Sequence, residues 1–228
     1  DPDEDQAILV AALEKFGSYS QSALFSRRYS RPIFLAASIA IFNQLTGVNV
    51  LLYYVLEVFA EFGSGHLNGH KDTIIVAATS LVATLIALNI IDKFGRKPLL
   101  LTGTVGMGVC LALLPAIRHM GWPPLTVVIV LVCYNSFFAF SQGTVIWVYL
   151  SEIFPLPVRS RGQTMGSSVH WIANALITGA FPIVASNLGS FVFVVLAAIM
   201  ALQFLVILFL YPETRQLGLE AVASAISK

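Results

Sequence analysis

Five long runs without a single Asp, Glu, Lys or Arg limit what this chain can fold into. They cover residues 32–56, 73–91, 98–117, 119–151 and 162–212. A helix that crosses a bilayer needs about 20 mostly apolar residues, so each of the first four runs fits one span. The last run divides at the polar segment Ser-Asn-Leu-Gly-Ser into two spans. The sequence therefore predicts six transmembrane helices.

Composition agrees with a membrane protein. The chain is 57% hydrophobic and 11% charged, whereas soluble proteins have roughly 45–50% apolar and about 25% charged residues. Cys110 and Cys133 both fall inside predicted spans, so no disulfide framework is implied. The net charge of +1 gives no general attraction to nucleic acid. No metal-ligand cluster, phosphate-binding loop or nucleophile triad stands out, so we expect no enzyme, no cofactor and no metal.

The distribution of Lys and Arg predicts the orientation. Eleven of the 13 cations fall on one side of the predicted spans, and only Lys71 and Arg118 fall on the other. Positive charge collects on the cytoplasmic side, so we expect an integral membrane protein of the plasma (inner) membrane with both termini cytoplasmic. The expected division is a cytoplasmic linker with a short amphipathic helix at 1–30, a six-helix domain at 31–211 with spans of about 31–62, 72–92, 98–118, 122–154, 161–186 and 189–211, and a cytoplasmic tail at 212–228.

The first predicted span carries the polar segment FNQLTGVN near its middle, at 42–49. Asn43, Gln44 and Asn49 would lie at the bilayer midplane, where unsatisfied amides are costly, so they must face protein or water. Gly47 also weakens the helix there. A helix interrupted at mid-membrane points to a transporter binding site. The alternative is that these amides only form hydrogen bonds between neighbouring helices.

Two further polar segments lie near the middle of later spans. FSQGTVIW (140–147) shares Phe, Gln and a following Thr with the first segment, which suggests three helices repeated in inverted orientation, unless the short match is chance. SSVHWIAN (167–174) places His170 and Asn174 on one helix face, although His170 could also be a packing residue. Amides and an imidazole both donate and accept hydrogen bonds, which suits a neutral polyhydroxylated ligand. The aromatic rings that could stack on its C–H face are Tyr53, Trp147 and Trp171.

Charged residues gather in two predicted cytoplasmic loops, DKFGRK and SEIFPLPVRSR. Glu152 and Arg159 of the second loop could pair with Arg96 or Asp92 of the first. The alternative is that these charges are solvated and only anchor the topology.

These segments together resemble one protein family. FNQLTGVNVLLYY, DKFGRK, WVYLSEIFP with Arg159, and PETRQLGLEAV are similar to the sugar porter branch of the major facilitator superfamily, which contains facilitative glucose transporters and bacterial xylose– and galactose–proton symporters. The resemblance covers residues 25–222 but only the C-terminal half of that family's fold. It implies an all-α membrane protein, one half of a twelve-helix fold built from a 3+3 inverted repeat. A natural half-length protein and a fragment are both compatible with it.

The resemblance also implies roles for individual residues. The residues it assigns to substrate binding are Asn43, Gln44, Asn49, Tyr53, Ser80, Gly143, Trp147, His170 and Trp171. Ser80 and His170 depart from the family, which commonly has an amide at both positions. The residues it assigns to a charge network that closes the cytoplasmic side are Asp92, Arg96, Glu152 and Arg159.

The expected function is therefore transport of a hexose or pentose by alternating access, with this chain supplying the C-terminal half of the sugar site. The expected partners are a monosaccharide, the lipid bilayer, and either the missing N-terminal six-helix half or a second copy of this chain. Protons are a further candidate partner, because uniport and proton symport both stay open. The alternatives are a sugar-binding or sensor module and a truncated half-transporter without transport activity.

Overall fold

The computed structural model describes residues 24–53 and 69–215 of the chain, and the regular structure within these ranges is entirely helical. Most of the predicted linker, the far end of the expected first span (54–62) and the tail beyond residue 215 lie outside the described residues. The helices are η1 (Arg27–Tyr29), α2 (Ser30–Leu45), α3 (Val48–Tyr53), α5 (Gly69–Phe94), α6 (Arg96–Met120), α7 (Pro124–Phe140), α8 (Gln142–Glu152), η2 (Leu156–Val158), α9 (Arg159–Leu188) and α10 (Phe191–Leu210).

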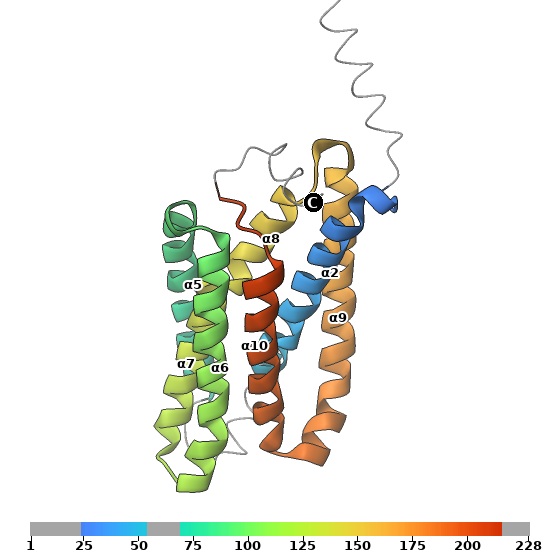
Figure 1. Ribbon diagram of the computed structural model, residues 1–228. Helices are drawn as coiled ribbons and strands as arrows, with labels where there is room; N and C mark the ends of the chain where they lie inside the picture. The colour runs from blue at the N-terminus through green and yellow to red at the C-terminus, as the bar shows by residue number, and fades with distance from the viewer. Residues whose placement is uncertain (1–23, 54–68, 216–228) are drawn as a thin grey trace, which may run out of the picture.

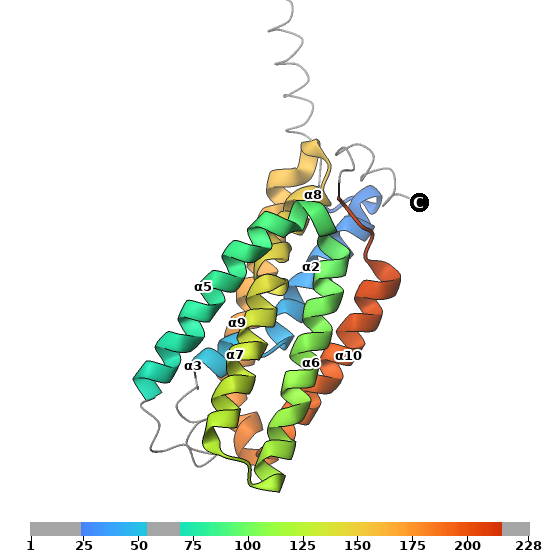
Figure 2. The same ribbon diagram turned by 90° about the vertical axis from the view of Figure 1, so that its left-hand side faces the viewer.

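Within the described residues, six helical segments are long and apolar enough to cross a membrane, which confirms the predicted number of spans. They run side by side along one direction as an elongated bundle (Figures 1 and 2). The segments are Arg27–Leu52, Ala77–Phe94, Arg96–Met120, Leu125–Glu152, Leu156–Leu188 and Phe191–Leu210.

The start of α2 and the end of α10 lie at the same end of the bundle (Figure 1), as an even number of spans requires. The α5–α6 and α8–α9 connections lie at this end too. We call it the charged end, because Arg96, Glu152 and Glu213 meet there.

Two of the six spans are interrupted. In the first span α2 and α3 are separated at Thr46 and Gly47, and Gly47 has a φ of 83°, which glycine adopts without the strain that a side chain would bring. The predicted interruption of this span is therefore present. In the fourth span α7 and α8 are separated at Ser141, whose N–H is shared between the carbonyl oxygens of Phe137 and Phe138. The two interrupted spans are the first of each set of three, the arrangement expected of an inverted repeat.

The interior consists of two apolar clusters with a polar layer between them. One cluster lies toward the charged end and includes Leu100 and Tyr149, and the other lies toward the opposite end and includes Met107 and Tyr134. Along the first span, α6, the fourth span and α10, buried polar residues separate the two sets. The residues of this polar layer are Asn43, Gln44, Thr104, Gln142 and Gln203. Because buried polar groups are costly without partners, this layer is the first place to look for a functional site.

Two spans are left almost uncovered by the other described helices. In the 18-residue apolar window of each span, 6% of the α9 residues and 11% of the α5 residues are buried, against 61% in the first span. One side of α9 packs against α2, and one side of α5 packs against α7. The remaining sides of both helices are open to whatever surrounds this six-helix unit.

Candidate functional site

The Gln44 side chain lies at the centre of a cluster with two other residues that the sequence singles out, His170 and Asn49. Its amide nitrogen lies 2.8 Å from Nε2 and 3.1 Å from Nδ1 of His170. A neutral imidazole can therefore accept a hydrogen bond from the amide N–H. Its amide oxygen accepts a hydrogen bond of 2.8 Å from Asn49 Nδ2. These residues come from α2, α3 and α9, so the interruption of the first span and the packing of α9 on α2 together assemble the cluster.

Two indole rings flank this cluster. The ring centroid of His170 lies 5.2 Å from that of Trp147 and 5.3 Å from that of Trp171, both in edge-to-face orientation. His170 is only 6% exposed, whereas Trp147 is 44% and Trp171 58% exposed. The imidazole is therefore held inside, while both indoles offer ring surface to a ligand. Such surfaces can stack on the C–H face of a sugar ring.

Asn43 is as buried as Gln44 but points to a different partner. Its amide nitrogen donates to the Gln142 carbonyl oxygen at 3.2 Å. The Gln142 side chain in turn donates to Thr104 Oγ1 at 3.2 Å, and Thr104 donates to the Leu100 carbonyl oxygen at 2.7 Å. These hydrogen bonds link α2 to α8 and α6, and they hold Asn43, the residue before Gln44, in place. Sequence reasoning missed Gln142 and Thr104 as members, although Gln142 stood out as a polar residue within an apolar span.

The other predicted ligand positions are less closely joined to Gln44. Ser80 is half-buried on α5, and no described hydrogen bond connects its side chain to Gln44 or His170. Gly143 follows the break before α8, where a Cβ atom would come within 3.1 Å of the Phe138 ring, so glycine lets the chain pack closely there. The side chain of Tyr53 lies outside the described residues.

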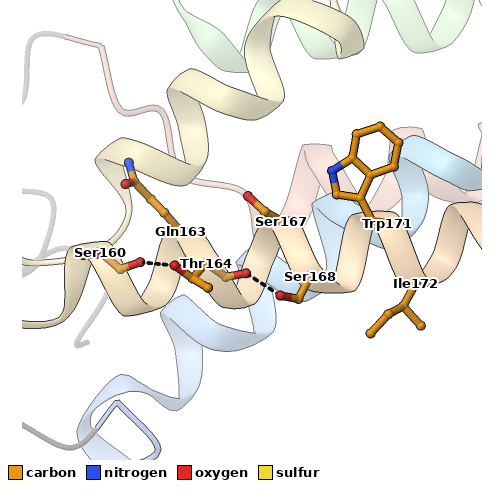
Figure 3. A pocket seen from close by; sticks show the side chains of 7 residues that line it. All are labelled: Ser160, Gln163, Thr164, Ser167, Ser168, Trp171 and Ile172. Atoms are coloured by element: carbon orange, nitrogen blue, oxygen red, sulfur yellow. Dashed lines mark hydrogen bonds between the residues drawn. The ribbon is translucent and has the colours of Figure 1, made fainter.

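An open hollow of about 610 Å³ lies along α9, and its lining includes Trp171, which flanks His170. Figure 3 shows its lining side chains projecting from one helix, with Trp171 at the end that adjoins His170. The hydroxyls of Thr164 and Ser168 donate to backbone oxygens one turn earlier, which leaves their remaining hydrogen-bonding capacity facing the hollow. The lining residues are Ser160, Gln163, Thr164, Ser167, Ser168, Trp171 and Ile172.

At the charged end, Arg96 is the centre of the predicted ionic network. It binds Glu152 through two hydrogen bonds, Nη2 to Oε1 at 2.6 Å and Nε to Oε2 at 3.1 Å. Its Nη1 also lies 3.1 Å from Asp92, whose side chain is 80% exposed. Arg159 contacts the Phe154 carbonyl oxygen at 3.3 Å, and no described ion pair joins it to the other three residues.

The segment after α10 adds two residues to this network that sequence reasoning missed. Thr214 Oγ1 donates to Glu152 Oε2 at 2.5 Å. Glu213 accepts hydrogen bonds of 3.0 Å from the backbone N–H groups of both Arg96 and Lys97, and so caps the first turn of α6. The PETR sequence could have predicted this contact, because an acidic residue just beyond a span can reach the N-terminus of a neighbouring helix.

Comparison with known proteins places the chain among transporters. The family model described as "Sugar (and other) transporter" matches residues 3–225. The galactose-proton symporter of Escherichia coli K12 is 33% identical over 216 residues, which are 90% of this chain and 46% of that protein. The D-xylose-proton symporter of the same strain is 36% identical over 155 residues, 68% of this chain and 32% of that protein. The chain thus spans about half the length, or less, of these curated relatives.

Solved structures lead to the same family. The proton:xylose symporter XylE of the major facilitator superfamily, bound to 6-bromo-6-deoxy-D-glucose, superposes with a TM-score of 0.77 at 32% identity, covering 85% of this chain and 42% of that one. The inward-open form of XylE from E. coli gives 0.76 at 28% identity, covering 96% and 46%. The chain therefore belongs to the sugar (and other) transporter family, and its six helices form one half of a major facilitator fold.

Proposed function

We propose that this chain supplies one half, the C-terminal one, of a transporter that moves a hexose or pentose across a membrane by alternating access. The observation that carries the proposal is the Gln44–Asn49–His170 cluster, held beside a helix interruption and flanked by two exposed indoles. Unwound helices near the membrane midplane are where transporters of this architecture bind substrate. The relatives' names, a galactose and a D-xylose symporter, support a monosaccharide as the substrate class.

The chemistry of the cluster favours a neutral ligand with many hydroxyls. Gln44, Asn49 and His170 now satisfy one another, so an incoming sugar would exchange these contacts for its own hydroxyls at little net cost. Each of the three groups both donates and accepts, as does a hydroxyl. No Lys or Arg joins the cluster among the described residues, which disfavours a carboxylate or phosphate substrate.

A second six-helix unit would complete the site. The open side of α9 presents Ser, Thr and Gln side chains, which hydrocarbon does not solvate, so this side belongs against protein or water. The N-terminal half of a longer protein would cover it, and a second copy of this chain is the other candidate. Together the two halves would enclose a water-filled path with the Gln44 cluster on one wall.

The charged end is proposed as the cytoplasmic gate. The Arg96–Glu152 pair ties the start of α6 to the end of α8. In the segment after α10, Thr214 binds Glu152 and Glu213 binds the start of α6. Opening that end would separate these elements, so the contacts favour the state closed toward the cytoplasm. We propose that this end faces the cytoplasm and that both termini lie on the cytoplasmic side of the plasma (inner) membrane, since the excess of Lys and Arg supports this orientation. Coupling to protons rests on the relatives named as proton symporters.

Uptake by proteoliposomes that contain the transporter, with this chain and its opposite half, tests the proposal. We expect saturable uptake of at least one of D-xylose, D-galactose and D-glucose, with no competition by an amino acid or a sugar phosphate. Trp147→Ala should lower the uptake, because it removes an exposed wall of the site. A saturable change in tryptophan fluorescence without uptake would instead favour the sensor alternative, and failure of all three sugars in both measurements would overturn the proposal.

A further inference from the structure

The interruption of the first span leaves one backbone oxygen that the helix itself does not satisfy. In a continuous helix the carbonyl oxygen of Thr46 would accept the N–H four residues later. The first bond of α3 instead runs from Leu51 N to Gly47 O at 2.8 Å. The Thr46 oxygen accepts from a distant side chain, the hydroxyl of Tyr134 on α7, at 2.7 Å.

Local contacts shape the break but do not fix the direction of α3. Thr46 Oγ1 donates to the Asn43 carbonyl oxygen at 2.7 Å and accepts from Val48 N at 3.2 Å, so it closes the turn within the segment. Tyr134 acts from outside it. Its side chain is only 2% exposed and packs in the same apolar cluster as Val48 and Leu51 of α3. At such a site an unmade hydrogen bond is costly, which makes the Tyr134 contact a strong constraint.

Through α3 this constraint reaches the Gln44 cluster. Asn49 is the second residue of α3, and it donates to Gln44 Oε1 at 2.8 Å. Tyr134 itself lies on α7, seven residues before the second helix interruption at Ser141. The Tyr134 hydroxyl thus connects the two interrupted spans on the α7 side of the second break, as the Asn43–Gln142 hydrogen bond does on its α8 side.

We infer that Tyr134 is a positioning residue, whose hydroxyl holds α3 against α7 and so aims Asn49 at Gln44. The role of this contact in sugar affinity rests on the proposed function, whereas its role in ordering α3 does not. Tyr134→Phe removes only the hydroxyl and keeps the ring in its apolar cluster. Tyr149→Phe is the matched control, since its hydroxyl is equally buried but has no hydrogen-bond partner among the described residues.

Hydrogen–deuterium exchange on the full chain in lipid nanodiscs tests the ordering of α3 without any ligand. We expect peptides covering residues 46–52 to exchange about tenfold faster in Tyr134→Phe, the effect of losing one buried hydrogen bond of about 1.4 kcal/mol. Tyr149→Phe should leave the exchange of this segment as in the parent. Equal exchange in Tyr134→Phe and the parent would overturn the inference, as would equal acceleration in both variants.

Binding of D-xylose, D-galactose and D-glucose to the assembled transporter tests the link to the site. For the sugar that the parent binds, Tyr134→Phe should weaken affinity about five- to tenfold in the parent background and have almost no effect in an Asn49→Ala background, because it acts through Asn49. The same loss in both backgrounds would show a general structural effect and refute the positioning role. If the parent binds none of the three sugars, the proposed function fails, while the exchange result still decides the ordering of α3.

Discussion

Replacing Glu152 with Gln should shift the transporter toward the conformation that is open at the charged end. Glu152 holds Arg96 by two hydrogen bonds, of 2.6 and 3.1 Å, and accepts one of 2.5 Å from Thr214. These three contacts join α6, α8 and the segment after α10, and they exist only while those elements lie together. We expect the open state to lack them, so weakening them should raise its population.

The size of the shift follows from burial. The side chain of Arg96 is 9% and that of Glu152 20% exposed, so water competes weakly for these hydrogen bonds. A hydrogen bond to a charged group contributes roughly 1.5–3 kcal/mol, and Gln keeps one weaker, neutral bond. We therefore expect a loss of about 2–3 kcal/mol, which is roughly a 30- to 140-fold change in the conformational equilibrium.

Asp92→Asn provides the matched control, because it removes the other carboxylate that contacts the Arg96 guanidinium group. Asp92 makes one contact at 3.1 Å and its side chain is 80% exposed. Exposed ion pairs contribute about 0–1 kcal/mol, so this variant should change the equilibrium by less than about fivefold. Both substitutions remove one negative charge, and they differ in how well the lost contact is shielded from water.

Labelling of a single accessible cysteine by a membrane-impermeant reagent measures the shift, with the buried Cys110 left in place. Cys133 is exposed and is first replaced by Ser, and Ser167→Cys then places the reporter in the hollow along α9. We expect labelling from the side of the charged end to rise strongly with Glu152→Gln and little with Asp92→Asn. Equal labelling of Glu152→Gln and the parent would refute the reasoning. These charges would then be solvated groups that only anchor the topology.

The remaining predictions concern the site, the packing and the need for a second half. Gln44→Ala and Asn49→Ala should each weaken sugar binding, measured by calorimetry, by about 1–3 kcal/mol, because each removes a hydrogen-bond partner of the sugar hydroxyls. Lower folding stability with unchanged sugar affinity would instead favour a packing role. His170→Asn should keep binding, because an amide also donates and accepts; complete loss would contradict this. Gly103→Ala should destabilise the fold by about 1–3 kcal/mol in thermal unfolding, because its Cβ would lie 2.2 Å from that of Ser141, whereas Gly179→Ala meets nothing within 4 Å and should not. The 228-residue chain alone should show no saturable sugar uptake, since one wall of the path is missing, and competable uptake by it would argue for a working dimer.

The sequence determines the number of spans and the polar centre of the first, since both are local properties. A charge-free run is stable in a bilayer wherever its neighbours lie, so six spans follow from the order of residues alone. Gly47 likewise marks the break in the first span, because the left-handed conformation is intrinsic to glycine. The exposed polar residues of α9 could be grouped by helical spacing in the same way.

Only the tertiary structure decides which of these residues meet. His170 lies 126 positions from Gln44 and Tyr134 lies 88 positions from Thr46, and nothing in the local pattern distinguishes these partners from other polar residues at the same depth. The helix packing also buries Asn43 and separates Arg159 from Glu152. Membrane depth follows from hydropathy along one segment, whereas contact across the bundle depends on how helices rotate and cross. Those angles are set by packing at many positions together, which no single segment encodes.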